Sequence, residues 1–427
     1  MTRRLLIVIV ALAVILRLGY VLLEGHTLSL EASGYDAYAV NLMAGHGYTR
    51  FPDLHPDSDL PPLYSFFLVG VYSLFGRSPI PVALVQIGFD VVTLLAIYAI
   101  GRRVGGDWVG LLAAAFTGFY PYLLFQDLSV NDTAIFIMLL TLAIWGVYRT
   151  GTWRGAAFVG LLLGLAALTK SLVVLLLPLI ALWWWRQFSR KQFGFRRAVA
   201  CATALGIVFV AVLLPWIVRN TRVQGTLTLI STNDGSNLYQ GNNPCVADYL
   251  LNGWDAQWVN CLNPTPPGLS ETAQSIWFRD QAFAYLRDHV SEWPRLFAVK
   301  FITLWSPELL PRSVPPSANL NDPTVLEYEQ PIFQLARLIH LLYFTPLLIL
   351  GIIGLILASR SRELTGKYAP LLMVLIVITV TYLIYHPSTR YRSPADPFLF
   401  VLAASALVTL IAPRLWHGAK PSASPKT

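Results

Sequence analysis

Residues 5–23, with the sequence LLIVIVALAVILRLGYVLL, form an apolar run that directly follows Thr2-Arg3-Arg4. A helix needs about 20 mostly apolar residues to cross a bilayer, and this run is long enough. A cleaved signal peptide has a shorter apolar core and a cleavage site of small residues, and the run has neither feature. We therefore predict that residues 5–23 are an uncleaved first membrane span.

The composition predicts a membrane protein along the whole chain. Of the 427 residues, 55% are hydrophobic and 13% are charged, and the mean hydropathy is +0.57. Soluble domains carry about 25% charged residues, so a soluble globular enzyme is excluded. The aromatic share of 13% and the lack of heptads exclude a disordered chain and a coiled coil. The predicted fold class is an all-α polytopic membrane protein.

Ten apolar segments have about the length of a membrane span. They lie near residues 5–23, 80–100, 108–126, 133–149, 155–169, 171–186, 198–218, 332–358, 368–385 and 397–413. The segment LYSFFLVGVYSLF at 63–75 is equally apolar, but it is short and lies between Pro61-Pro62 and Gly76. We predict that this segment is a helix in the membrane interface.

The basic residues predict how these spans are oriented. If the N-terminus is cytoplasmic and 63–75 does not cross, the cytoplasmic side holds more than half of the 31 lysines and arginines and only two acids, Asp107 and Glu363. The positive-inside rule requires such a distribution, whereas a crossing at 63–75 would move Arg102-Arg103 to the outside. Both termini are therefore predicted to be cytoplasmic. The net charge of +8 then reflects topology, and no nucleic-acid partner is expected.

The outward-facing segments divide the chain into three predicted parts. Residues 1–218 form a transmembrane catalytic module with a first outer loop at 24–79, residues 219–331 form an outer-face cap, and residues 332–427 form the last spans and a cytoplasmic tail. Cys245 and Cys261 in the cap could form a disulfide on an oxidising outer face, or remain two buried thiols.

Four acidic residues lie at the predicted outer rim of the membrane: Glu31, Asp36, Asp127 and Asp132. A carboxylate held against hydrocarbon is costly, and such residues usually serve as a base, a metal ligand or a proton relay. In the alternative interpretation, Asp36 and Asp132 cap the helices that follow them. The spacing alone does not separate the two.

Four basic residues lie at the predicted outer mouths of different spans: Lys170, Arg219, Arg390 and Arg392. Each alone is typical of a side chain that reaches the lipid headgroups. Together they would form a receptor for an anionic headgroup, because arginine forks suit phosphate. A departing lipid phosphate needs positive charge, and a carboxylate can deprotonate the group that attacks a sugar carbon. The combination predicts glycosyl transfer from a polyprenyl-phosphate sugar.

A series of stretches, taken in order, resembles the integral membrane glycosyltransferases of the C-type (GT-C) fold. Within that fold the chain is similar to bacterial relatives of protein O-mannosyltransferases and of lipid A aminoarabinose transferase, which are glycosyltransferase family 39-like. The stretches are EASGYDAYAVNLMAGHGY (31–48), PPLYSFFLVGVYSLFG (61–76), IGRRVGGDWVGLLAAAF (100–116), GLAALTK (164–170), PWIVRN (215–220), GNNP (241–244) and RYRSPADP (390–397). The resemblance covers nearly the whole chain. It implies an outward-facing catalytic loop with interfacial helices after the first span.

The resemblance also implies roles for single residues. The family's acid after the first span falls on Glu31 in place of the usual aspartate, so that either Glu31 or Asp36 is the expected catalytic base. The second acidic position falls on Asp132, where it could orient the acceptor or hold an ion. Arg390, Tyr391, Arg392 and Lys170 are the expected donor-phosphate contacts, to which the cluster of bases adds Arg219. Arg219, Asn220 and Gly241 to Asn243 also match recurrent motifs of unassigned role, which could simply anchor the outer loop.

The implied partners are a polyprenyl-phosphate sugar donor, a lipid, protein or glycan acceptor, and membrane lipids. The implied location is a bacterial inner membrane with the active site facing outward, and the implied reaction inverts the sugar carbon. No cofactor is firmly predicted. Glu31 and Asp132 could meet around a magnesium or manganese ion, or act without one.

Two other functions stay open on the sequence. A polymerase or ligase of polyprenyl-linked glycans would share the donor but should centre on arginines in large outer loops. A lipid-sugar transporter or flippase would place ionisable groups within spans, where Arg17 and Asp90 are the clear cases. Asp90 requires an explanation in any interpretation, either a buried pair or a hydrogen bond to Thr93.

Overall fold

The computed structural model describes residues 2–25, 28–30, 34–51, 56–189, 194–315, 331–361 and 363–416. Helices dominate these residues, and the β pairing in this part of the chain is one isolated bridge between Trp254 and Ser313. Helices suit a bilayer because each helix satisfies its own backbone hydrogen bonds. The predicted all-α membrane fold is confirmed.

Six helical segments are long and apolar enough to cross a membrane. They are α1 (Thr2–Glu24), α4 (Pro79–Gly105), η3 with α9 (Ser171–Phe188), α10 (Gly194–Gln224), α16 (Pro331–Ser359) and η6 with α17 (Leu364–Ile384). A seventh span is possible where α5 (Asp107–Gly118) and α6 (Pro121–Leu128) meet at a bend of 58°. Pro121 opens α6 and cannot donate a backbone hydrogen bond, which explains the break.

The three remaining predicted spans are helical but shorter. They are α7 (Thr133–Arg149), α8 (Trp153–Ala167) and the apolar part of α19 (Asp396–Trp416). All ten predicted segments are therefore helices, while six or seven meet the length of a span. The count of about ten crossings stays a prediction.

Glycines allow α8 and α10 to pack closely. A Cβ on Gly160 of α8 would lie 2.5 Å from the backbone oxygen of Leu205 in α10, and one on Gly164 would lie 2.8 Å from the Val212 side chain. Small residues four apart let helix backbones approach within a membrane, where dispersion contacts hold helices together. Glycine at these two positions therefore sets the distance between the helices.

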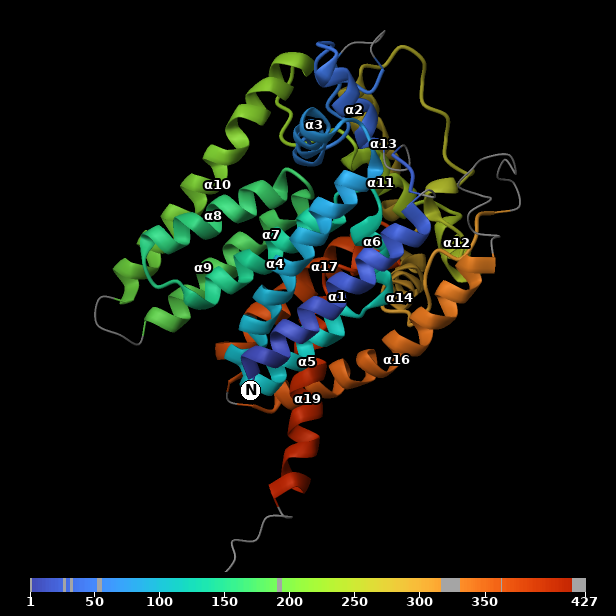
Figure 1. The fold of residues 1–427 in the computed structure, drawn as a ribbon. Coiled ribbons are helices and arrows are strands. Elements are labelled where there is room, and N and C mark those ends of the chain that lie inside the picture. The colour runs from blue at the N-terminus through green and yellow to red at the C-terminus, as the bar shows by residue number, and fades with distance from the viewer. Residues whose placement is uncertain are drawn as a thin grey trace, which may run out of the picture.

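Shorter helices gather at one end of the bundle, opposite the start of α1 and the end of α19 (Figure 1). Among them, α3 (Leu63–Phe75) has the bounds predicted for the interfacial helix and ends at Gly76, whose φ of 80° favours glycine. The others are α2 (Tyr35–Met43), α11 (Asp234–Gly241), α12 (Val246–Asn252), α13 (Glu271–Asp288) and α14 (Trp293–Leu304). The division of the chain into three parts stays a prediction.

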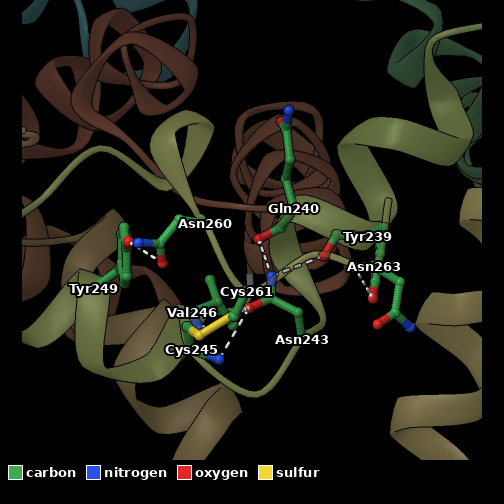
Figure 2. Close-up of a disulfide and its surroundings, with 9 residues drawn as sticks. All are labelled: Tyr239, Gln240, Asn243, Cys245, Val246, Tyr249, Asn260, Cys261 and Asn263. Atoms are coloured by element: carbon green, nitrogen blue, oxygen red, sulfur yellow. Dashed lines mark hydrogen bonds between the residues drawn. A yellow bond between two sulfur atoms is a disulfide. The ribbon is translucent and has the colours of Figure 1, made fainter. Parts of the chain in front are cut away.

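A disulfide joins Cys245 and Cys261, with an S–S distance of 2.09 Å (Figure 2). Apolar side chains around it form a separate hydrophobic cluster that includes Val246, Tyr249 and Leu296. Of the two alternatives for these cysteines, the disulfide is confirmed. The segment around it has its own core, as expected for a folded cap.

A buried ion cluster joins α1, α4 and α6. Arg17 Nη2 lies 2.8 Å from Asp127 Oδ2 and 3.1 Å from Asp90 Oδ2, and Arg17 Nη1 donates to the Gly118 carbonyl at 2.8 Å. The hydroxyl of Thr93 donates to the Phe89 carbonyl instead of Asp90. Asp90 is therefore explained by the buried pair, and the alternative of a bond to Thr93 is wrong.

Candidate functional site

Four segments distant in sequence meet at Asp132, which immediately precedes α7. The carboxylate is almost fully buried and does not cap the helix. Lys170 Nζ donates to both of its oxygens, at 2.8 and 2.7 Å. Arg390 Nη2 donates to Oδ1 at 3.3 Å, and the Tyr35 hydroxyl donates to Oδ2 at 3.2 Å. The predicted helix cap is thus replaced by a network of two cations and a tyrosine.

This site carries more positive than negative charge. Burial raises the pKa of Asp132, but the adjacent Lys170 and Arg390 cations outweigh it and hold the pKa below its ordinary value. Burial likewise lowers the pKa of Lys170, which Asp132 partly offsets. With Asp132 ionised between two bases, the cluster can accept a further negative charge.

Arg390, and Thr133 next to Asp132 in the chain, each carry a buried polar atom that is free to bind. Arg390 Nε and the hydroxyl of Thr133 have no hydrogen-bond partner within the described part of the chain. A buried donor without a partner costs free energy, which a ligand that accepts a hydrogen bond would recover. Arg390 Nε therefore adds hydrogen-bond capacity beside the excess positive charge.

Arg392 points away from the site into the protein core. It is fully buried, and its Nε donates to Asp396 Oδ1 at 3.1 Å, while its Nη2 donates to the Tyr120 hydroxyl at 3.2 Å. Its Nη1 donates to backbone carbonyls, and its guanidinium carbon lies 3.9 Å from the centre of the Phe344 ring. These contacts fix the short helix α18 (Thr389–Arg392) to the core.

Tyr391 lies between Arg390 and Arg392 in the chain and packs on α17. Its ring stacks on Tyr382 of α17, with centroids 4.7 Å apart and planes 10° apart, and its edge meets His386 at 5.2 Å. The three residues of the RYR motif therefore differ in position. Arg390 reaches Asp132, Tyr391 packs on α17, and Arg392 enters the core.

Asp36 already has strong partners of its own. Arg77 donates to both carboxylate oxygens, at 3.1 and 2.6 Å, and the Tyr72 hydroxyl donates to Oδ1 at 2.8 Å. The predicted capping role of Asp36 is wrong, because α2 begins at Tyr35 after Gly34 and has no side-chain cap. The other candidate base, Glu31, lies outside the described residues.

Arg219 belongs to a different cluster from Asp132. It lies near the end of α10 and donates to the backbone carbonyl of Tyr48 at 2.8 Å and to that of Asp57, while its guanidinium faces the Trp216 ring at 4.9 Å. Asn220 adds a bond to the Ile230 carbonyl at 3.0 Å. The Arg219 contacts hold the first outer loop on α10, and the Asn220 contact holds the segment after α10, which agrees with the anchoring role left open for this motif.

Two residues that contact these acids, Tyr35 and Arg77, had no role predicted from the sequence. Tyr35 lies in the stretch EASGYDAYAVNLMAGHGY (31–48). Its hydroxyl contact with Asp132 could not be predicted, because it joins residues 97 positions apart. Arg77 follows α3 and reaches Asp36 across 41 positions. A basic residue directly after an interfacial helix was the available signal for Arg77, and that signal does not identify a partner.

The fold is that of the C-type (GT-C) membrane glycosyltransferases, and the predicted resemblance is confirmed at the level of the fold. The family model of dolichyl-phosphate-mannose-protein mannosyltransferases matches residues 59–216, a stretch that includes Asp132 and Lys170. No curated protein matches the sequence.

Three solved structures illustrate the likeness. The oligosaccharyltransferase of Archaeoglobus fulgidus tethered to an acceptor peptide has a TM-score of 0.53 at 12% identity, over 97% of this chain and 51% of that one. The oligosaccharyltransferase AglB of Archaeoglobus fulgidus, with an inhibitory peptide and a dolichol-phosphate, has a TM-score of 0.51 at 13% identity, over 99% of this chain and 52% of that one. ArnT from Cupriavidus metallidurans bound to undecaprenyl phosphate matches at 0.40 and 15% identity, over 92% and 76%. The chain spans about half the length of the archaeal enzyme.

Proposed function

We propose that this protein is a membrane glycosyltransferase that moves a sugar from a polyprenyl-phosphate donor to a lipid, protein or glycan acceptor. The reaction takes place on the outer face of a bacterial inner membrane. The observation that carries the proposal is that Lys170 and Arg390 both bind the buried carboxylate of Asp132. The family model and the membrane fold support the same class of reaction.

The donor phosphate binds at Lys170 and Arg390. These two cations exceed the charge of Asp132 by one, and Arg390 Nε is an additional buried donor. Attraction between charges is stronger in a site that excludes water than in bulk solvent. Asp132 therefore holds the two cations in place while the phosphate neutralises the excess. Apolar spans beside the site accommodate the polyprenyl chain.

Sugar transfer proceeds by direct displacement with inversion. A carboxylate takes the proton of the acceptor's O–H or N–H group as that group bonds to the anomeric carbon. The bond from that carbon to the phosphate oxygen breaks, and its electron pair leaves with the polyprenyl phosphate, which Lys170 and Arg390 stabilise. Asp36 is already held in an ion pair with Arg77, so we assign the base to Glu31.

The molecules bound in the similar structures support the type of partner. The archaeal oligosaccharyltransferase was solved with an acceptor peptide and with a dolichol-phosphate. A peptide acceptor is therefore one of the three acceptor types to be tried.

A divalent ion at Asp132 fits poorly with the residues around it. Lys170 and Arg390 already donate to its two oxygens. Within the described ranges, no group of three His, Cys, Asp or Glu side chains could hold a metal ion. Our mechanism uses no metal-dependent step, and a magnesium or manganese requirement is one outcome of the assay below.

The test is release of polyprenyl phosphate from radiolabelled polyprenyl-phosphate sugars, supplied singly to the purified protein with membrane-extract acceptors, with and without chelator. We expect release with one donor, loss of release in Glu31→Gln, and retention in Asp36→Asn if that variant folds. Full activity in Glu31→Gln would contradict the assigned base. No release with any donor would contradict a polyprenyl-phosphate donor and favour a polyprenyl-diphosphate donor or lipid transport.

A further inference from the structure

Lys300 of α14 is fully buried and lacks an acidic partner among the described residues. Its Nζ donates to Asn242 Oδ1 at 2.9 Å, to the Leu383 carbonyl at 2.9 Å and to the Ile384 carbonyl at 3.3 Å. Burial lowers the pKa of Lys300 to about 7. A buried lysine whose ammonium donates only to neutral oxygens is costly, so its position requires an explanation.

The carbonyls that Lys300 binds are at the end of α17 (Ala369–Ile384). The last four carbonyls of a helix lack partners within the helix, and positive charge is favourable there. Asn242 Nδ2 also donates to the Ile384 carbonyl, at 2.7 Å. Lys300 and Asn242 together therefore form an external cap on α17.

The neighbours of Asn242 extend this cap in both directions. A Cβ on Gly241 would lie 2.6 Å from the Tyr385 carbonyl, so the two backbones touch directly after α17 ends. Asn243 Oδ1 accepts bonds from the backbone N–H groups of Cys245 and Val246, each at 3.0 Å (Figure 2). The stretch from Gly241 to Asn243 thus joins the disulfide segment to the end of α17.

The end of α17 leads directly to the proposed phosphate site. Six residues after Ile384, Arg390 reaches Asp132, and Tyr391 stacks on Tyr382 within α17 itself. The end of α17 therefore sets the place of Arg390 together with the contacts that Arg392 makes with the core. We propose that Lys300 is a positioning residue that, with Asn242, holds the 383–392 segment so that Arg390 meets the donor phosphate. This inference rests on the proposed function for the identity of the ligand.

The test compares Lys300→Met with Arg287→Met. Arg287 is an exposed basic residue of α13 that pairs with its neighbour Asp288, so its replacement makes a basic-to-Met change without touching α17. Hydrogen exchange by mass spectrometry reports on residues 383–392 without any donor present. We expect exchange there to rise about tenfold or more in Lys300→Met, as for loss of a charge-assisted hydrogen bond, and not in Arg287→Met.

Donor kinetics form the second readout. KM for the polyprenyl-phosphate sugar should rise at least about tenfold in Lys300→Met, with a smaller change in kcat, because binding is weakened rather than the base removed. Lys300→Arg should restore part of the affinity, since guanidinium can donate to the same carbonyls. Unchanged exchange at 383–392, or raised exchange with an unchanged KM, would overturn the proposal.

Asn242→Ala keeps the proposal testable if Lys300→Met does not fold. It removes the shared partner and should loosen the same segment. Where both variants fold, hydrogen exchange at 383–392 in the double variant should be no faster than in the single variants. Additive increases in exchange would show that the two residues act separately, against the proposal. If wild-type protein releases no polyprenyl phosphate while Asn242→Ala or Lys300→Met loosens 383–392, the function fails and the positioning role stands.

Discussion

At the residue scale, the partner of each acid decides what that acid can do. Asp132 lies between Lys170 and Arg390, Asp36 is paired with Arg77, and Asp127 is paired with Arg17. All were expected at the membrane rim with similar roles. Only Asp132 has more than one basic side chain beside it, and that surplus of positive charge makes its surroundings a candidate anion site.

Lys170→Met tests this surplus. With one cation lost, Asp132 and Arg390 neutralise each other, so affinity for polyprenyl phosphate should fall at least about tenfold. Lys170→Arg should retain most of the affinity. Binding is measured by titration of the purified protein, with Arg287→Met as the exposed-charge control. Equal affinity in Lys170→Met and wild type would rule out the site.

Asp59 predicts a pH-dependent stability. Burial, then Glu271 and Asp57, raises its pKa to about 6. Because the pKa of Asp59 is higher in the folded than in the unfolded protein, protonation of Asp59 favours the folded state at low pH. This contribution to stability is lost as the pH rises through about 6. Asp59→Asn should therefore raise the free energy of unfolding by about 1–3 kcal/mol at pH 7.5.

The gain from Asp59→Asn should shrink steadily between pH 6 and pH 4, because the wild-type carboxylate becomes protonated there. Thermal unfolding at pH 7.5 and pH 4 measures both limits. A gain of the same size at both values would show that the carboxylate charge is not the cause.

At the element scale, helix contacts depend on a few small residues. Gly160 meets the backbone of Leu205, whereas a Cβ on Gly206 of α10 would meet nothing within 4 Å. Gly160→Ala should lower stability by about 1–3 kcal/mol, because the clash is with backbone that cannot rotate away. Gly206→Ala should be neutral or slightly stabilising, since alanine favours helix. Thermal unfolding of both variants checks the pair, and equal effects would contradict close packing of α8 on α10.

At the scale of the whole molecule, the predicted topology places the cap and the cytoplasmic loops on opposite sides of the membrane. Asn252 of the cap and Ser189 after α9 are both exposed. In intact cells, a membrane-impermeant thiol reagent should label Asn252→Cys and should label Ser189→Cys only after lysis. Wild-type protein is the control, because its free cysteine, Cys201, is buried. The reverse pattern would invert the proposed orientation.

The sequence by itself determined the helices of this protein. Apolar runs such as 5–23 and 63–75 must satisfy their backbone hydrogen bonds locally, so their place in the chain is enough to predict α1 and α3. Positions of lysine and arginine carry the predicted orientation in the same local way. The chemistry of the site was also foreseeable in outline, because Lys170, Asp132 and Arg390 stood out as charges at the ends of apolar segments.

Only the tertiary structure decided which of these residues meet. Arg390 contacts Asp132 across 258 positions, while Arg392, two residues on, turns into the core toward Asp396. Asp90 likewise pairs with Arg17 of another helix, and Lys300 binds a carbonyl at the end of α17. Such pairs depend on how helices pack. Packing arises from side-chain shape summed over many distant contacts, which no local pattern in the chain encodes.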